Sequence, residues 1–365
     1  MKTLRDYEKE LNKCSKCGLC ESVCPLYKLV PNDCVASKGK FIMLRGVARG
    51  DLKLSKNINK YIDLCLKCGK CKEFCPGGID ICQILSAAKS DYIKNKISER
   101  FIKFVQGRYV FDLIIKIGKL VSRPFRPKLS EKGDKTVIYF KGCVNQIHPN
   151  TDKYIHKIFN DKIKIIEPDF DCCGLPFLSE GNLERFEQVA KHNIEYLKSD
   201  ADYIVTDCAS CESTLLSYPE YLNEEAFQIK DNTFVNWGDI IAEQNIKFKS
   251  KKPVRVTFHK PCHLKSDEFF ERIMSRCVNI DYVKMKEYDS CCGFAGSFAL
   301  KNPKLSSEIS SQKADNIKTT GADYVITTCP LCVIGLKRGL IMKGSGIKVM
   351  SLLEFLATKC TQIKD

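Results

Sequence analysis

The feature that most constrains this chain is the spacing of its cysteines. Of the 22 cysteines, 18 fall into four sets, and the sets form two pairs of matching copies. The pattern C-x-x-C-x-x-C-x-x-x-C-P begins at Cys14 and again at Cys65. A single cysteine, a Cys-Cys-Gly triplet and a C-x-x-C pair then follow from Cys143, and again from Cys262. Thiolates in this number and spacing predict iron–sulfur clusters, and therefore electron transfer.

The length and composition of the chain indicate a globular protein of a reducing compartment. Its 365 residues suit two to three domains of roughly 100–200 residues each. No apolar stretch approaches the ~20 residues of a membrane-spanning helix. The first residues, Met1 to Asp6, lack the apolar core of a signal peptide. We therefore expect a cytoplasmic location, where reduced thiols favour metal ligation over disulfides.

Positive charge is concentrated in the N-terminal third. Residues 1–128 contain 27 Lys and Arg against 12 Asp and Glu, which accounts for the whole formal net charge of +15. Within this part, residues 96–132 combine apolar residues at helical spacing with a basic excess, so we predict a basic amphipathic linker helix. Two interpretations stay open. The helix packs between domains, or it presents a basic surface to an acidic partner or to the anionic inner face of a membrane.

The two N-terminal cysteine runs have the spacing of bacterial dicluster ferredoxins. Three cysteines two residues apart can hold three corners of one cubane, whereas the fourth lies too far along the chain to close the same cluster easily. We therefore predict two [4Fe–4S] clusters that exchange their fourth ligands. The predicted ligands are Cys14, Cys17, Cys20 and Cys75 for cluster 1, and Cys65, Cys68, Cys71 and Cys24 for cluster 2. Zinc also accepts four thiolates, but two identical runs that each end in Cys-Pro disfavour it.

From Lys135 onward, predicted strands alternate with helices and the sequence repeats itself. Residues 201–211 match residues 322–332, which indicates two similar half-domains with parallel sheets. The predicted strands are 137–140, 162–166, 201–206, 253–258, 279–285 and 322–327. The predicted fold class is α+β multidomain, with an N-terminal α-helical ferredoxin-like dicluster domain, the linker and two repeated α/β half-domains. The corresponding boundaries are 1–95, 96–132, 133–245 and 246–365.

Each C-terminal cysteine set follows predicted strands. Cys143 comes after the first strand, Cys172 and Cys173 after the second, and Cys208 after the third. Ligands of open α/β sheets gather beyond the carboxyl ends of the strands. We therefore expect the five thiols of each copy to converge on one place.

This arrangement resembles the cysteine-rich CCG domains of the heterodisulfide reductase and glycolate oxidase iron–sulfur families. The order of domains is similar to the iron–sulfur subunit of glycolate oxidase, the C subunit of anaerobic glycerol-3-phosphate dehydrogenase and the D subunit of heterodisulfide reductase. The resemblance implies one or two further iron–sulfur clusters, noncubane in the heterodisulfide reductase type, whereas four-thiolate cubanes with a spare cysteine remain open. The implied ligands are Cys143, Cys172, Cys173, Cys208 and Cys211 in the first CCG domain, and Cys262, Cys291, Cys292, Cys329 and Cys332 in the second.

Three histidines lie near these cysteines and are candidates for a catalytic role. His259 and His263 flank Cys262, and His148 follows Cys143. A histidine at such a place can donate a hydrogen bond to a cluster sulfur or deliver a proton to a substrate thiolate, although many histidines near turns are only polar. The remaining cysteines, which fit no set and are expected to be small buried hydrophobes, are Cys34, Cys82, Cys277 and Cys360.

Three functions are consistent with these patterns, and the first is electron transfer within a dehydrogenase complex of several subunits. The sequence contains no dinucleotide fingerprint, no Walker A run and no H-E-x-x-H, so we expect no flavin or NAD in this chain. A flavoprotein dehydrogenase partner would oxidise a 2-hydroxy acid or glycerol 3-phosphate, and a membrane or quinone-linked partner would take the electrons. The alternatives are an enzyme that reduces a thiol disulfide at a CCG cluster, and a non-redox scaffold or sensor. No nucleic acid partner is expected.

Overall fold

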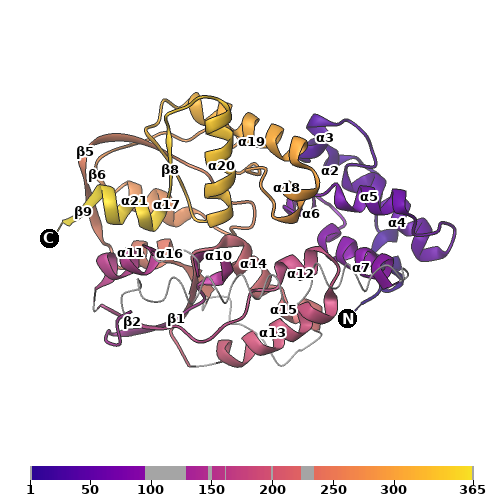
Figure 1. The fold of residues 1–365 in the computed structure, drawn as a ribbon, viewed down its shortest axis with the longest axis horizontal. Helices are drawn as coiled ribbons and strands as arrows, with labels where there is room; N and C mark the ends of the chain where they lie inside the picture. The colour runs from indigo at the N-terminus through magenta and orange to yellow at the C-terminus, as the bar shows by residue number, and fades with distance from the viewer. Residues whose placement is uncertain are drawn as a thin grey trace.

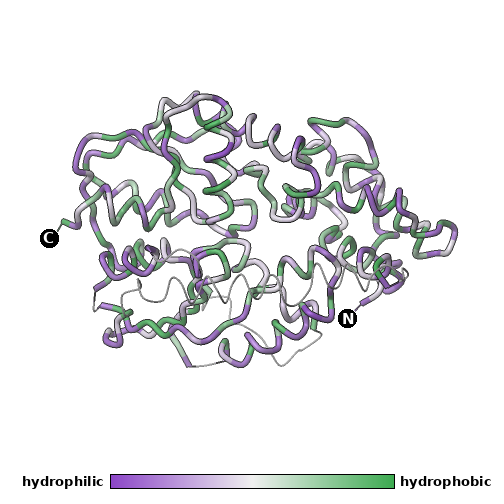
Figure 2. Tube along the Cα trace, viewed as in Figure 1, coloured by the Kyte–Doolittle hydropathy of each residue, from purple (hydrophilic) through white to green (hydrophobic). Residues whose placement is uncertain are grey.

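The computed structural model describes residues 2–94, 129–146, 150–160, 162–198, 200–222 and 234–363. In this part of the chain, short N-terminal helices lie at one end of the molecule, beside two α/β units (Figure 1). Residues 96–128 of the predicted linker helix, which spans 96–132, lie outside the described ranges. No helix among the described residues is long and apolar enough to cross a membrane, and hydropathy alternates along the trace (Figure 2).

The N-terminal region is helical, as predicted, and two longer helices support its loops. Helices α4 and α7 pack around a small apolar core that includes Leu11, Leu44 and Ile84, each with no exposed surface. The shortest helices follow directly on the two cysteine loops. The elements are η1 (Leu4–Tyr7), α1 (Glu8–Asn12), α2 (Leu19–Ser22), α3 (Pro25–Leu29), α4 (Ser37–Arg49), α5 (Lys56–Asp63), α6 (Lys70–Glu73) and α7 (Ile81–Lys94).

The first α/β unit contains a parallel four-stranded sheet with the order β2-β1-β3-β4. Its strands are β1 (Lys135–Tyr139), β2 (Ile163–Ile166), β3 (Tyr203–Thr206) and β4 (Phe234–Asn236). Its helices are α10 (Gly142–Asn145), α11 (Asn150–Phe159), α12 (Leu175–Ser179), α13 (Leu183–Leu197), α14 (Ala209–Leu216), α15 (Tyr218–Leu222) and α16 (Trp237–Glu243).

The second unit repeats this strand order as β6-β5-β7-β8 and adds an antiparallel strand, β9, that pairs with the start of β5. Its strands are β5 (Lys247–Phe258), β6 (Val278–Tyr282), β7 (Tyr324–Thr327), β8 (Lys348–Ser351) and β9 (Cys360–Ile363). Its helices are α17 (Glu268–Met274), α18 (Ser297–Lys301), α19 (Pro303–Lys318), α20 (Pro330–Met342) and α21 (Leu352–Lys359).

The sheet topology confirms the predicted repeat of parallel α/β units. In each unit the second strand in sequence lies on one side of the first strand, and the third lies on the other side. The strand order therefore reverses between β1 and β3, and between β5 and β7. Such a switch point leaves a crevice beyond the carboxyl ends of the strands, where ligands bind. The domain boundaries stay predictions, although the two sheets lie within residues 135–236 and 247–363.

A network of ion pairs joins the three parts of the molecule. The carboxylate of Asp63, at the end of α5, contacts the Lys89 ammonium at 2.7 Å and the Lys301 ammonium at 3.1 Å. Lys301, from the second unit, also contacts Glu180 of the first unit. Although burial opposes ionisation of Asp63, the two ammonium groups hold its pKa below the usual carboxyl value. The network therefore stabilises the contact between parts at neutral pH and weakens only in acid, as pH falls through that lowered pKa.

We predict that Asp63→Asn destabilises the fold. The change removes charged hydrogen bonds to Lys89, whose side chain is 7% exposed, so the free energy of unfolding should fall by ~1.5–3 kcal/mol. Urea unfolding followed by circular dichroism measures this loss. Glu187→Gln is the matched control, because it breaks an exposed i,i+4 pair with Lys191 and should cost only ~0.3–0.5 kcal/mol. Equal losses in the two variants would show that Asp63 has no special role.

Candidate iron–sulfur sites

The two N-terminal cysteine loops share an unusual backbone. Lys16 and Lys67 have φ values of 61° and 53°, and Gly18 and Gly69, two residues later, have φ values of 83° and 76°. A lysine in the left-handed region is strained, and such strain clusters at functional sites. Glycine adopts the same region without strain, which explains why the repeated Lys-Cys-Gly ends in glycine. The chain thus curls twice in the same way around the middle cysteine of each run.

The first loop forms a small cavity at the surface of the N-terminal region. Three cysteines of the first run line this cavity, and the fourth lining cysteine is Cys75 of the second run. Its volume is about 30 Å³. Cys17 is exposed, as are the neighbouring Lys13 and Lys16. The cavity therefore contains the four residues predicted for cluster 1 and lies next to a basic, accessible rim.

The second loop forms a similar cavity deeper in the molecule. Its volume is also about 30 Å³, and Cys65, Cys68 and Cys71 line it together with Cys24 of the first run. Burial raises the pKa of Cys24 and raises that of Cys71 to about 12. The four thiols are grouped as predicted for cluster 2, and a metal centre would give these buried groups a reason to ionise. Ligation itself stays a prediction.

The five cysteines of the first CCG set lie in contact with one another. The five thiols form a row in which each lies within hydrogen-bonding reach of the next. Their order in the row is Cys143, Cys172, Cys173, Cys211 and Cys208. Four of them are at most 8% exposed, and Cys143 is half-buried. They converge at the switch point because Cys143 follows β1 and Cys208 follows β3 on either side of it.

The second CCG set repeats this order. The thiols of Cys262, Cys291, Cys292, Cys332 and Cys329 form the same succession of contacts beyond β5 and β7. The two sets also meet each other, because the Cys208 thiol interacts with the Cys329 thiol. This contact was not predicted from sequence, since no pattern shows that the two half-domains face each other through their cysteine loops.

His259 is enclosed at the second set. Its side chain has no exposed surface, and its two ring nitrogens have no hydrogen-bond partner of ordinary geometry in the described part of the chain. The Cys292 thiol is the polar group that interacts with the ring. The ligand atoms of His259, Cys292 and Cys332 all lie within 4.8 Å of one another. Burial lowers the pKa of His259, so the imidazole is neutral near neutral pH.

His263 connects the cysteine loops of three predicted centres. Its Nε2 lies 2.8 Å from the carbonyl oxygen of Lys67, in the loop of cluster 2, and Nδ1 lies 3.0 Å from the Ser210 hydroxyl, in the first CCG loop. It also directly follows Cys262 of the second CCG set. An Nε2–H tautomer donates to the carbonyl and accepts from the hydroxyl. His148 lies outside the described residues.

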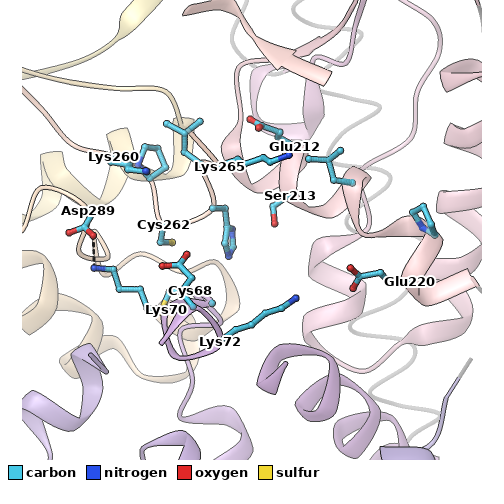
Figure 3. A pocket seen from close by; sticks show the side chains of 17 residues that line it. Cys68, Lys70, Lys72, Glu212, Ser213, Glu220, Lys260, Cys262, Lys265 and Asp289 are labelled. Atoms are coloured by element: carbon cyan, nitrogen blue, oxygen red, sulfur yellow. Dashed lines mark hydrogen bonds and ion pairs between the residues drawn. The ribbon is translucent and has the colours of Figure 1, made fainter. Parts of the chain in front are cut away.

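The second CCG set borders two spaces that share Cys262 and His263 as lining residues. All five of its cysteines line a cavity of about 130 Å³ with mainly apolar neighbours, and Cys65 of the N-terminal region lines it too. Cys262 also lines an open cleft of about 940 Å³ between the N-terminal region and the two units. Figure 3 shows Cys68 and Cys262 in this cleft with Lys70, which pairs with Asp289 at 2.8 Å. The cleft thus joins cluster 2 to the second set.

Two further residues at these sites were missed by sequence reasoning. Cys82, predicted to be a small hydrophobe, lines the cavity of cluster 2 as a fifth cysteine. Glu212, next to Cys211, lines the open cleft, and burial raises its pKa to about 7. Neither residue belongs to one of the sequence motifs described above. Cys82, for example, has no counterpart in the other cysteine run. The unassigned Cys34 and Cys277 are half-buried, and Cys360 is buried.

The cysteine geometry suits iron–sulfur clusters. No disulfide joins cysteines in the described part of the chain, so the thiols are free to ligate. They form compact nests whose members lie far apart in sequence. Beside one nest, the ring nitrogens of the enclosed His259 have no hydrogen bond of ordinary geometry in the described part of the chain. A bound cluster would neutralise the mutual repulsion of ionised thiols and satisfy these groups together.

Comparisons with known proteins agree with this geometry. A family model for a 4Fe-4S dicluster domain matches residues 10–79, and one for the cysteine-rich domain CCG matches residues 137–216 and 256–337. An iron–sulfur protein of Methanocaldococcus jannaschii is 30% identical over 89% of this chain and 67% of its own length.

Two functionally named relatives are more distant. The D subunit of dihydromethanophenazine:CoB–CoM heterodisulfide reductase from Methanosarcina acetivorans is 24% identical over 95% of this chain and 93% of its own. The glycolate oxidase iron–sulfur subunit of Escherichia coli is 23% identical over 87% of each chain. A crystal structure of a hypothetical protein from Helicobacter pylori shares the fold, with a TM-score of 0.54 at 13% identity over 90% of this chain and 67% of that one.

These matches define the class of protein as an iron–sulfur protein with a dicluster domain and two cysteine-rich domains. The chain belongs to the family that includes the M. jannaschii iron–sulfur protein, together with glycolate oxidase iron–sulfur subunits and heterodisulfide reductase D subunits.

We predict that the exchange of fourth ligands can be read from iron content. If Cys75 completes cluster 1, the double variant Cys14→Ser/Cys75→Ser loses one cluster, or about four irons. The double variant Cys14→Ser/Cys24→Ser removes a ligand from each cluster and should lose about eight irons. Iron and sulfide are counted after anaerobic purification, with Cys34→Ser as the control. The reverse pattern, with the larger loss in the first variant, would exclude the exchange.

Proposed function

We propose that this chain is the iron–sulfur electron-transfer component of a dehydrogenase complex of several subunits that oxidises a 2-hydroxy acid, such as glycolate, or glycerol 3-phosphate. The observation that carries the proposal is the continuous succession of cysteine nests from the surface to the interior. It starts at the exposed Cys17, passes the cluster 2 cavity and reaches the second CCG set, where Cys68 lies in the electrostatic field of Cys262. It ends at the first CCG set through the contact of Cys208 with Cys329.

The proposed ligands are the sets of the sequence analysis, with four cysteines each for the two N-terminal clusters and five for each CCG centre. Iron–sulfur clusters supply one-electron carriers when bound. The residues of this chain hold them close together and fix the loops relative to one another. His263 contributes to this positioning, because its hydrogen bonds connect the cluster 2 loop with the first CCG loop.

The proposed entry point is cluster 1. Exposed Lys13 and Lys16 flank the exposed Cys17, and Leu19 nearby is 47% exposed. A basic rim with an apolar residue suits the acidic surface of an electron-donating partner, since complementary charge speeds encounter. We propose a flavoprotein as that partner because the sequence has no fingerprint for a nucleotide cofactor of its own. A cytoplasmic site with peripheral contact at a membrane is part of the same proposal.

The proposed electron transfer through the chain is tested at its first step, the entry of electrons at cluster 1. In the double variant Cys14→Ser/Cys75→Ser, cluster 1 is lost while the inner centres remain, so an external donor must reach a buried site. We expect stopped-flow reduction by reduced flavodoxin, an acidic flavoprotein, to slow at least tenfold. The inner centres should still be fully reduced by dithionite, which shows that they are intact. An unchanged rate with flavodoxin would show that electrons do not enter at cluster 1.

A second candidate function is reduction of a disulfide at the second CCG centre. The observation that favours it is that Cys262 lines both the enclosed cavity and the open cleft. A disulfide that reached this centre would take two electrons, supplied one at a time by the reduced iron–sulfur centres of this chain, and two protons, and its S–S bond would break to give two thiols. Glu212 and His263 line the same cleft.

This second function makes a prediction that needs no partner. A small disulfide, such as oxidised glutathione or cystine, added to the oxidised protein should change the electron paramagnetic resonance of one centre. Enlarging the cleft residue with Ser213→Trp should block the change without loss of iron, since Ser213 lines the cleft and is no proposed ligand. If no member of a panel of disulfides alters any signal, the chain is a relay only.

A further inference from the structure

The two CCG units repeat each other in topology and cysteine order, but they differ at one enclosed position. Three residues before the first cysteine of the set, the second unit has His259 and the first has Phe140. Both side chains have no exposed surface. Both residues follow the first strand of their sheet, where the backbone N–H donates to the carbonyl of the neighbouring strand, to Val205 from Phe140 and to Ile326 from His259. The positions are therefore equivalent, and only one side chain has nitrogen.

The rings of Phe140 and His259 have different surroundings. The Phe140 ring packs on Phe170, with ring centroids 4.8 Å apart, so it is an ordinary core residue. The His259 ring is directed at the Cys292 and Cys332 thiols, and neither of its nitrogens has a hydrogen bond of ordinary geometry in the described part of the chain. An enclosed polar atom without a partner costs ~1–3 kcal/mol. A neutral imidazole here would carry that cost at both nitrogens.

A metal at this place would remove the cost at one of the two nitrogens. Neutral imidazole has one nitrogen lone pair, which binds iron in other iron–sulfur proteins when histidine replaces cysteine. The three ligand atoms of His259, Cys292 and Cys332 lie within 4.8 Å of one another, which is close enough for one ion to contact all three.

We propose that His259 binds iron through a ring nitrogen in the second CCG centre, which is therefore a mixed thiolate–imidazole centre, whereas the first centre has thiolate ligands only. The inference rests on the proposed presence of an iron–sulfur centre at this cysteine set. It makes the two centres unequal despite the repeat. Because the neutral nitrogen takes the place of one of the five thiolates proposed for this centre, it lowers the negative charge of the centre and raises its reduction potential. Electrons would therefore collect at the second centre, next to the open cleft.

The test is nitrogen coupling in pulsed electron paramagnetic resonance. The reduced wild-type protein should show the strong coupling of a directly bound nitrogen, and histidine-selective 15N labelling should change it. The chain has five histidines, so the variant His259→Phe, which copies the first unit, identifies the one responsible. The coupling should disappear in this variant, and the potential of the second centre should fall by at least 59 mV, a tenfold change in a one-electron equilibrium.

Matched controls separate ligation from packing. His192→Phe changes a histidine on α13 outside the cysteine sets and should leave coupling and potential unchanged. His259→Asn is a smaller polar substitution that should also lose the bound-nitrogen coupling if the Phe variant does not fold. A strong coupling that persists in either variant, or only a weak coupling in the wild type, overturns the proposal. If the protein contains no iron–sulfur centre at this cysteine set, the proposed function fails as well, and iron and sulfide analysis of the same sample distinguishes the two results.

Discussion

The structure depends on the convergence of buried thiols at the carboxyl ends of two facing sheets. Parallel strands deliver every loop that follows them to the same edge, so a single cysteine, a cysteine pair and a C-x-x-C turn meet although they are separated by tens of residues. The loops of the two units then meet each other through Cys208 and Cys329. Without ligands, such nests would be costly, since burial makes thiolates unfavourable and leaves His259 unsatisfied. A bound iron–sulfur cluster would remove this cost and stabilise the core.

The N-terminal region brings its cysteines together in a different way. Its described residues, 2–94, contain no strand to gather the cysteines, and instead two short loops curl around their middle cysteine with similar backbone angles. Because the two runs lie side by side, each cavity receives its fourth cysteine from the other run. The arrangement links residues 14–24 to residues 65–75, so the region holds together through its proposed clusters as much as through its small apolar core.

Much of this architecture could be predicted from the sequence. Regular cysteine spacing predicted the cysteine groups, and the match of residues 201–211 to residues 322–332 predicted two units with parallel sheets. Short edge strands were missed, because three residues in β4 contain no periodic signal. Sequence could not show the contacts between units, such as the bonds of His263 to Lys67 and Ser210, since they depend on docking of surfaces rather than on local pattern. Sequence also could not show that Cys82 lines the cavity of cluster 2, although its packing against the N-terminal apolar core agrees with the expected hydrophobic role.

The ion-pair network around Asp63 has a consequence for how electrons can travel. It ties α5 and α7 to Glu180 of the first unit and Lys301 of the second, close to the apolar contact of Leu26 with Phe298. With these parts locked, the proposed carriers keep fixed separations, so no swinging arm carries charge from one to the next. A change in the rate of electron transfer would then arise at the protein surface, when another molecule docks there. The protein would then transfer electrons between fixed centres, without a moving domain.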